Sequence, residues 1–353
     1  PMICDQWINE STVSFSFNDK YIEVERNNKF MKEIRIGLLG LGNIGTGTYK
    51  ALEMNREKIE KLVGGSVNIT SILEKDIDRK RDITVSKEQF VNSIEDITED
   101  PDIDIVIELL GGIEPASSYI EKALLAGKHV VTANKAAVAS SWERLNAAAE
   151  KTGVQFRFEA SVGGGIPVLT PLAGCAAVNQ YTEVLGIVNG TTNYILYKMT
   201  EEGMSYEDAL KDAQVKGFAE ADPTADVEGI DAANKLSILI ALMFDKYIPP
   251  TEIPRTGITE ITKEKIEEAR ENDCVIKLIA HATLQDDGEL TYEVRPTFIK
   301  NYHPLAGVLE EFNAVYIKGN LVGKLMFYGP GAGPLPTGSA VLGDVTEIAK
   351  AIR

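Results

Sequence analysis

Cysteine and histidine, which build disulfide frameworks and many metal and proton-transfer sites, are scarce in this sequence. There are three cysteines, Cys4, Cys175 and Cys274, and three histidines among 353 residues. Because the cysteines are odd in number and widely spaced, they offer neither a disulfide framework nor a metal-ligand pattern. A reducing cytoplasm is therefore the simplest setting for the chain.

Basic residues and long apolar runs are scarce as well. Lys and Arg number 36 against 53 Asp and Glu, which gives a formal net charge of −17 and a pI near 4.8. Without a dominant basic surface, the chain is unsuited to bind nucleic acid or an anionic membrane. No apolar run approaches the roughly 18 residues of a membrane helix. The length is sufficient for two domains, and a small molecule is the expected partner.

Residues 1–30 differ in pattern from the rest of the chain. Residues 11–18 alternate weakly like a strand, and residues 23–29 are polar. The segment lacks the positively charged start and apolar core of a signal peptide. A fresh start follows at Met31, so we expect residues 1–30 to be an N-terminal extension that is dispensable for activity.

The first motif that predicts a ligand site is a glycine motif directly after an apolar segment. Residues 34–39 have the pattern of a buried strand, Gly40-Leu-Gly-Asn-Ile-Gly45 follows, and residues 47–62 have a helical pattern. In this position Gly40 allows a tight turn, Gly42 close approach of a pyrophosphate, and Gly45 near contact of helix and strand. The helix N-terminus then faces the phosphate charge. The motif predicts a dinucleotide-binding site, and the alternative is a glycine-rich turn without a ligand.

A second predicted strand, residues 67–73, ends where the ribose 2′ substituent of a dinucleotide is recognised. Glu74 at this point would favour NAD. Lys75, Arg79 and Lys80 could instead hold the 2′-phosphate of NADP. The sequence offers both signs of charge, so the preference between NAD and NADP stays open.

Two further segments have the pattern of strands that end at glycine or polar residues. Residues 103–110 lead to Gly111, and residues 128–134 lead to Lys135. Strands that alternate with helices predict an α/β fold with a Rossmann-type, doubly wound parallel sheet. Ligands of such sheets bind at the carboxyl ends of the strands, which is where these residues fall.

The pattern changes after residue 155. Glu159 is followed by a glycine-dense loop, residues 160–167, and then by a helical pattern. Alternate carbonyls of this loop, with Glu159, could form an oxygen cage for a hard cation. A domain hinge with a proline-initiated helix is the alternative. Residues 182–193 are then expected to form a strand ending in small polar residues, among them Asn189 and Thr191, which suits the floor of a small-substrate site.

The run from Lys216 to Lys235 is the most informative stretch of the chain. Its twenty residues hold five carboxylates, with a proline and a glycine that imply a shaped loop leading into a helix. Asp231 and Lys235 lie four apart on one face of that helix, and the apolar residues 236–244 must be buried. A lysine at the mouth of a buried helix is a candidate proton donor for a small cationic substrate. The alternative is an ordinary, solvated helix pair.

Five motifs, in this order, resemble those of homoserine dehydrogenase. They are GLGNIG at 40–45, VVTANK at 130–135, EASVGGGIP at 159–167, GIVNGTTNYIL at 186–196 and KGFAEADPTADVEGIDAANK at 216–235. The resemblance runs from about Met31 to the C-terminus. The segment around Gly333 is also similar to the family's return into its nucleotide domain.

The resemblance implies a function and an architecture. Homoserine dehydrogenases reduce L-aspartate 4-semialdehyde to L-homoserine with NADP or NAD, on the route to threonine, methionine and isoleucine. The resemblance further implies a possible monovalent cation (Na or K), a homodimer, and a second α+β domain for catalysis and dimerisation. The expected parts are residues 1–30 as an extension, 31–158 plus 331–353 as the dinucleotide-binding domain, and 159–330 as the substrate-binding and dimerisation domain.

The resemblance also implies roles for individual residues. Lys235 would be the acid/base that protonates the developing alkoxide, and Lys135 and Asp231 would act with it. The candidate substrate-binding residues are Glu220, Asp226, Asp231, Lys135, Asn189 and Thr191. The candidate cofactor-binding residues are Gly40, Gly42, Asn43, Ile44, Gly45, Lys75, Gly111, Lys135 and Gly333. The candidate cation ligands are Glu159, Val162, Gly164 and Ile166.

One departure from the family and two rival functions accompany this hypothesis. Because the chain stops at Arg353, we expect a monofunctional form without a C-terminal ACT domain, and no threonine feedback by that route. Another oxidoreductase of a small amino-acid aldehyde, aspartate-semialdehyde dehydrogenase, would need a nucleophilic cysteine and a histidine base. Cys175 lies in an apolar setting, and His281 lies on a helical pattern. A non-enzymatic NAD(P)-binding sensor would have no need of two lysines with an acidic wall.

Overall fold

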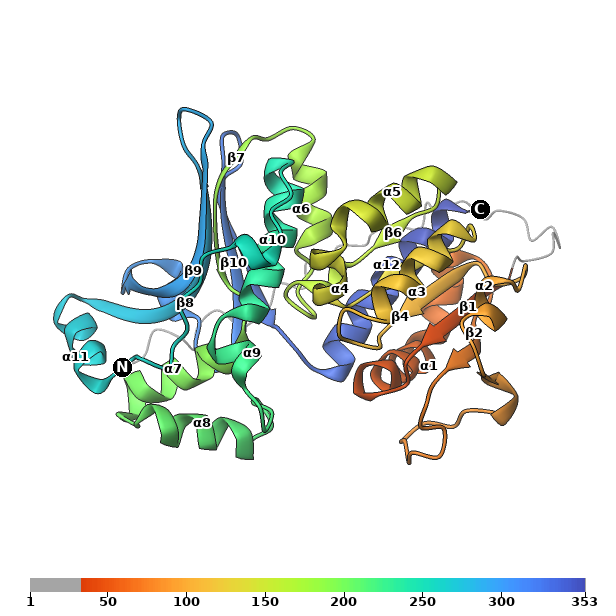
Figure 1. The fold of residues 1–353 in the computed structure, drawn as a ribbon, viewed down its shortest axis with the longest axis horizontal. Helices are drawn as coiled ribbons and strands as arrows, with labels where there is room; N and C mark the ends of the chain where they lie inside the picture. The colour runs from red at the N-terminus through yellow and green to blue at the C-terminus, as the bar shows by residue number, and fades with distance from the viewer. Residues whose placement is uncertain (1–32, 353) are drawn as a thin grey trace, which may run out of the picture.

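The computed structural model describes residues 33–352. The expected N-terminal extension and Cys4 lie outside the described residues, as does Arg353. Within residues 33–352 there are two sheets, of six and five strands, each with its own helices. The two assemblies lie side by side, the first on the right and the second on the left in Figure 1.

The first sheet is wholly parallel, with the strand order β3-β2-β1-β4-β5-β6. Its strands are β1 Ile34–Leu39, β2 Val67–Leu73, β3 Phe90–Val91, β4 Ile105–Glu108, β5 His129–Thr132 and β6 Phe156–Arg157. The helices of this half are α1 Asn43–Val63, α2 Glu95–Thr98, α3 Ala116–Leu125, α4 Lys135–Ser140, α5 Trp142–Thr152 and α12 Pro334–Ala351. This is the strand order of a doubly wound dinucleotide-binding sheet, so the predicted fold is confirmed.

Continuous burial along the central strand explains why this sheet is parallel and covered on both faces. Ile34, Ile36, Leu38 and Leu39 of β1 are each fully buried. A strand that is apolar at successive positions has no face that tolerates water, so helices must pack on both sides. The carboxyl end of β1 is thereby placed at an edge where the following glycines meet the helix α1.

The second sheet is antiparallel, with the strand order β11-β10-β7-β8-β9. Its strands are β7 Tyr181–Ile187, β8 Cys274–Leu284, β9 Leu290–Lys300, β10 Phe312–Gly319 and β11 Gly323–Pro330. The helices are α6 Leu169–Ala176, α7 Gly190–Glu202, α8 Tyr206–Val215, α9 Thr224–Val227, α10 Ile230–Phe244 and α11 Lys263–Glu271. The helix α10 packs against β7, β8 and β9, and its apolar residues 236–244 join that core as expected. The second, α+β half is therefore confirmed.

Several predicted boundaries were wrong, and each has a local cause. The helix α1 begins at Asn43 rather than at residue 47, because Gly42 is already its N-cap. The strand expected over 182–193 ends at Ile187, since the Asn189 side chain accepts the Thr192 N–H at 2.9 Å and starts the helix α7. His281 lies on β8, not on a helix.

The last helix returns to the first half of the molecule. In Figure 1 α12 lies in the right-hand half, and it packs along α1. The contact is close enough that a Cβ on Gly47 would lie 2.4 Å from the Pro334 carbonyl oxygen. Val341, Val345 and Ile348 of α12 share a core with β1. The chain therefore crosses between the halves twice, before α6 and again after β11.

A buried cation lies inside the second half. Lys277 of β8 is 3% exposed, and its ammonium donates to the Asn193 side-chain oxygen at 3.0 Å and to the Val308 carbonyl at 2.6 Å. Both acceptors are uncharged. Burial lowers the pKa of Lys277 to about 8, and the charge of Glu201 opposes this in part.

The shifted pKa of Lys277 has a consequence for stability. A lysine of the unfolded chain has a pKa of about 10.4, so between about pH 8 and about pH 10 the unfolded state holds more protons than the folded state. We predict that the free energy of unfolding rises with pH across this window. Lys277→Met should lose the rise, as measured by urea unfolding. Lys198→Met, which removes a lysine paired with Glu202 on α7, should keep it, and an equal rise in the Lys277→Met protein would contradict the assignment.

Candidate active site

Two lysines and one carboxylate form the centre of the site. The Lys235 ammonium donates to the Asp231 carboxylate at 2.7 Å and to the Val188 carbonyl at 2.6 Å. The Lys135 ammonium lies 3.2 Å from the other oxygen of the same carboxylate. Asp231 and Lys235 come from the first turns of α10, whereas Lys135 is the first residue of α4 in the other half. The ion pair therefore joins the two halves of the molecule.

Burial and the neighbouring charges shift the pKa values of these three groups in different directions. Burial alone would raise the pKa of Asp231, but the charges of Lys235 and Lys135 outweigh it and hold that pKa well below the ordinary value. Burial lowers the pKa of Lys235, and the neighbouring Lys135 lowers it further, against the opposing charge of Asp231. The pKa of Lys135 is raised, chiefly by Asp231. Lys235 is therefore the lysine that gives up its proton more readily.

An asparagine links this centre to a second carboxylate. The Asn189 side-chain amide donates to Asp226 at 2.7 Å and to Asp231 at 2.9 Å. Burial raises the pKa of Asp226, so its charge is poorly compensated within the protein. A cationic group that entered beside Asp226 would supply the missing compensation.

Two cavities meet at this group. One of about 420 Å³ is lined by Lys235, Asn189 and Thr191, together with Gly331 and Gly333. Its neighbour, of about 630 Å³, includes the exposed Glu220 and Arg255. Lys135, Asp226 and Asp231 line both. The structure thus brings together all the predicted catalytic and substrate-binding residues. Lys216 also lines the smaller cavity; it opens the run that the sequence singled out, but its charge alone did not mark it.

The glycine motif has the geometry that a pyrophosphate needs. Gly40 has a φ of +93°, and a Cβ on Gly45 would lie 2.2 Å from the Gly40 carbonyl oxygen. A Cβ on Gly42, in contrast, would meet no heavy atom of the described residues within 4 Å. The first turn of α1, which lies wholly within the described residues, carries no acidic side chain. An open backbone at a helix N-terminus can accept a phosphate.

The predicted cofactor residues lie in three positions, two of them at this motif and one beside Lys235. A cavity of about 920 Å³ is lined by Gly40, Gly42, Lys75 and Gly111. Asn43 and Ile44 open α1, and Asn43 lines an adjacent cavity of about 530 Å³. Gly333 lies apart from them, beside Lys235. Most dinucleotide candidates therefore line cavities separate from those of the substrate candidates, whereas Gly333 and Lys135 line the cavity that contains Lys235.

The end of β2 has both signs of charge, but they are used differently. The Glu74 carboxylate accepts the Leu41 N–H at 2.6 Å and the Asp76 N–H at 3.0 Å, and Arg81 lies 3.7 Å away. Burial would raise the pKa of Glu74, but these N–H groups lower it. Lys75 and Arg79 are exposed and line the large cavity. Glu74 lines the same cavity, so an acid that accepts backbone N–H groups and two exposed cations border one space.

The glycine-dense loop uses Glu159 in a way that the sequence did not suggest. The Glu159 carboxylate accepts the backbone N–H groups of Val168, Leu169 and Thr170 at 2.6, 2.7 and 2.7 Å. It therefore caps the N-terminus of α6. Within residues 33–352, no three His, Cys, Asp or Glu side chains gather as metal ligands. A cation in this loop would depend on backbone carbonyls.

The residues that a cysteine-dependent rival needs are elsewhere. Within residues 33–352, neither the free thiols Cys175 and Cys274 nor any histidine lines the two cavities around Lys235. His281 instead pairs with Thr283 and Glu183 on the second sheet. None of the helices in the described part of the chain is long and apolar enough to cross a membrane.

Comparisons with known proteins agree with this geometry. Residues 40–159 match a family model described as homoserine dehydrogenase, NAD binding domain, and residues 167–346 match one described as homoserine dehydrogenase. The homoserine dehydrogenase of Bacillus subtilis is 45% identical over 92% of this chain and 74% of its own length. That of Lactococcus lactis is 42% identical over 90% and 74%.

Solved structures give the same result. The crystal structure of a homoserine dehydrogenase from Thiobacillus denitrificans superposes with a TM-score of 0.87 at 40% identity, over 91% of this chain and 74% of that one. A hyperthermophilic archaeal homoserine dehydrogenase in complex with NADPH superposes with a TM-score of 0.75 at 26% identity, over 89% and 97%.

The glycine geometry generates a paired prediction. Gly45→Ala should lower the free energy of unfolding by more than about 1 kcal/mol, because its Cβ overlaps the Gly40 carbonyl. Gly42→Ala should leave the unfolding temperature close to that of the parent and weaken dinucleotide binding at least roughly tenfold, because its Cβ enters open space at the helix N-terminus. Thermal unfolding and titration of nicotinamide fluorescence measure the two effects. Unchanged dinucleotide affinity in Gly42→Ala would refute the phosphate site.

Proposed function

The chain belongs to the homoserine dehydrogenase family, and we propose that Lys235, Asp231 and Lys135 carry the acid–base chemistry of its reaction. It is an NAD(P)-dependent oxidoreductase that acts on a CH–OH group, interconverting L-homoserine and L-aspartate 4-semialdehyde in amino-acid biosynthesis. The single observation that supports the assignment of residues most strongly is the buried carboxylate shared by two lysines from the two halves.

Lys235 is suited to the proton transfer that accompanies reduction. A nicotinamide bound between the two halves would supply a hydride to the aldehyde carbon, which would place the carbonyl electron pair on the oxygen. Lys235 donates its proton to that oxygen and becomes a neutral amine. Its lowered pKa favours this donation, while Asp231 holds its ammonium in place beforehand. In the oxidation of homoserine the same amine takes the hydroxyl proton.

Three carboxylates that line the two cavities, which we name the acidic wall, are suited to a zwitterionic substrate. They belong to Glu220, Asp226 and Asp231. We assign the substrate ammonium to Glu220 and Asp226, because Asp226 is half-buried and its charge is poorly compensated. Lys135, half-exposed beside Asp231, supplies a cation for the substrate carboxylate or the cofactor. Asn189 and Thr191 form the floor between them. A dicarboxylate would meet repulsion from the same wall.

The proton-donor role of Lys235 is testable by substitution. Lys235→Met should lower kcat by roughly 10²–10⁴-fold, the range expected for loss of a general acid. Its affinity for NADPH should stay unchanged, since Lys235 does not line the dinucleotide cavity. Steady-state kinetics and NADPH fluorescence titration provide the measurement, with Lys198→Met as the control lysine. Near-parental turnover in Lys235→Met would sink the assignment.

We extend the proposal to the cofactor and assign a preference for NADP over NAD. Glu74 lines the cavity, but its oxygens already accept two N–H groups and one of them lies 3.7 Å from Arg81, which leaves the carboxylate less free to accept a ribose hydroxyl. Lys75 and Arg79 line the cavity with no carboxylate bonded to either within residues 33–352, and they suit a 2′-phosphate. The carbonyls of Val162, Gly164 and Ile166 are the proposed ligands of a monovalent cation.

The proposed preference for NADP predicts how kcat/KM differs between the two cofactors. The kcat/KM with NADPH should exceed that with NADH, and Arg79→Ala should reduce the ratio about tenfold or more, since a hydrogen bond to a charged group contributes about 1.5–3 kcal/mol. Arg270→Ala, which changes an arginine on α11, is the control. A ratio unaltered by Arg79→Ala would contradict the proposal. The same assay with Na⁺, K⁺ or a bulky organic cation tests the proposed carbonyl site.

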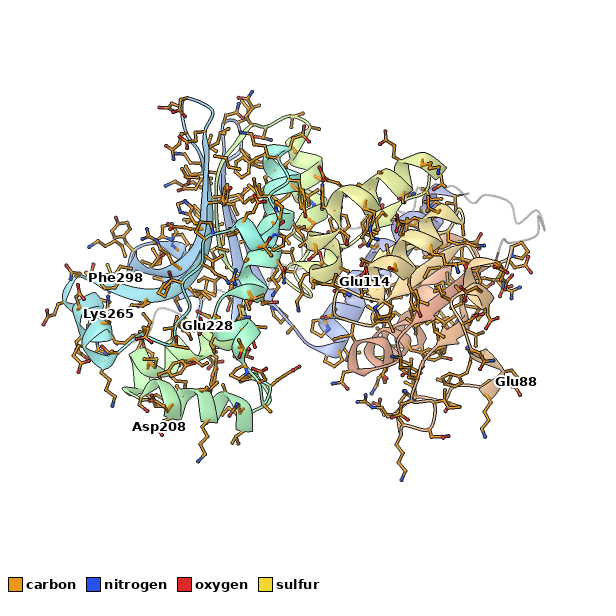
Figure 2. The ribbon with its side chains drawn as sticks, in the orientation of Figure 1. Glu88, Glu114, Asp208, Glu228, Lys265 and Phe298 are labelled. Atoms are coloured by element: carbon orange, nitrogen blue, oxygen red, sulfur yellow. The ribbon has the colours of Figure 1, made fainter. Side chains whose placement is uncertain are left out.

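The proposal includes a division of the chain and an assembly. Residues 31–158 plus 331–353 are assigned to the dinucleotide and residues 159–330 to the substrate, which the strand ranges of the two sheets support. We also propose a homodimer formed through the second sheet. Phe298 on β9 lies on the side away from the first half in Figure 2, and Met326 and Tyr328 on β11 are likewise exposed. The free thiols support a reducing, cytoplasmic setting.

A further inference from the structure

The two connections between the halves lie against each other. A Cβ on Gly164, in the first connection, would lie 2.3 Å from the Gly331 carbonyl oxygen in the second. A Cβ on Gly165 would lie 2.6 Å from the Pro336 side chain. The Gly165 N–H also donates to the Pro330 carbonyl at 3.3 Å. Both connections therefore pass through one narrow junction, formed by residues 164–165 and 330–336. A small shift of one connection would displace the other.

A carboxylate from α12 fastens this junction. Asp344 is 4% exposed, and one of its oxygens accepts the Glu159 N–H at 2.9 Å. The other oxygen lies 3.7 Å from the Arg157 guanidinium of β6. Glu159 in turn caps α6 through three N–H groups. Asp344 and Glu159 thus form a continuous link from α12 to α6, which we name the clasp.

The clasp connects the two helices on which the reaction depends. At one end α12 packs along α1, whose N-terminus carries the glycine motif. At the other end α6 packs against α10, whose first turns carry Asp231 and Lys235. The substrate-side acid/base and the dinucleotide-side glycines are thereby joined by four packed helices and two carboxylates. At the site itself, the ion pair of Lys135 and Asp231 makes a second connection between the two halves.

We propose that Asp344 is a positioning residue, which acts through Glu159 to hold Lys235 and the dinucleotide helix at the separation that hydride transfer requires. This inference rests on the proposed function of Lys235. Hydride transfer is sensitive to distance, since a misplacement of about 1 Å can lower a rate on the order of 10²-fold. A hydrogen bond that a buried carboxylate accepts fixes such a separation more narrowly than apolar contact does, because it is directional.

A purely stabilising role fits the surroundings of Asp344 less well. Burial and, to a smaller extent, the charge of Glu159 raise the pKa of Asp344 to about 7, while the hydrogen bond from the Glu159 N–H and the charge of Arg157 oppose the rise. A carboxylate in an environment that disfavours its charge is weak evidence for stability. A cavity of about 370 Å³ is lined by Asp344, Glu159 and Leu242, so apolar side chains do not fill the space beside the clasp. The geometry of the hydrogen bond from the Glu159 N–H therefore accounts for a carboxylate at position 344 better than stability does.

Asp344 variants separate positioning from stability. Asp344→Ala should lower kcat roughly 10–100-fold and raise the primary isotope effect with deuterated NADPH, because hydride transfer becomes slower. The Kd for NADPH and the KM for the semialdehyde should change less than about threefold by the same argument. Asp344→Asn keeps an oxygen that can accept the Glu159 N–H, so it should recover most of the kcat.

A matched control lies on the same helix. The buried Thr346 donates to the Leu342 carbonyl within α12, so Thr346→Val should keep the parental kcat and isotope effect. If Asp344→Ala fails to fold, Asp344→Ser, whose hydroxyl is too short to reach Glu159, takes its place with the same expected loss. A kcat within twofold of the parent in these variants, or an equal loss in Thr346→Val, would overturn the clasp. An inactive parent protein would refute the proposed function instead.

Discussion

The arrangement of the site depends on the burial of the Asp231 carboxylate between two ammonium groups. In water such a cluster would contribute little, because solvent screens each charge. At 6% exposure the carboxylate needs both lysines, and each lysine comes from a different sheet assembly. The separation of the two halves is therefore set by an electrostatic requirement as well as by apolar packing. Without Asp231, two like charges would face each other across the boundary.

The same polar atoms serve the fold and the chemistry. The side-chain oxygen of Asn189 accepts the Thr192 N–H at the start of α7, and this fixes the direction of the amide nitrogen. That nitrogen then reaches Asp226 and Asp231 together. The same Asn189 side chain therefore both starts the helix α7 and orients the carboxylates of Asp226 and Asp231. It follows that the floor of the substrate cavity is as rigid as the helix that Asn189 begins.

Much of this molecule could be anticipated from its sequence, and the remainder has physical reasons. The pattern of β1, the glycine motif and the i, i+4 pair of Asp231 and Lys235 are local, so periodicity and spacing were sufficient. The pairing of Lys135 with Asp231 joins residues far apart in the chain, and only the resemblance to a family suggested it. Asn189 and its neighbours look like the end of a strand, because small polar residues are compatible with both a strand end and a helix cap. The use of Glu159 as a cap requires knowing where α6 lies, which no local pattern contains.

The return of α12 to the first half has a consequence for biosynthesis. The core around β1 includes Val341, Val345 and Ile348, so it cannot be completed until α12 has left the ribosome. The core of the second half is also completed late, because it includes Val315 and Ile317 of β10, and β11 ends at Pro330, just before α12 begins. The face of α1 that packs against α12 therefore stays uncovered through most of translation, and the two halves complete their cores at nearly the same point of the chain.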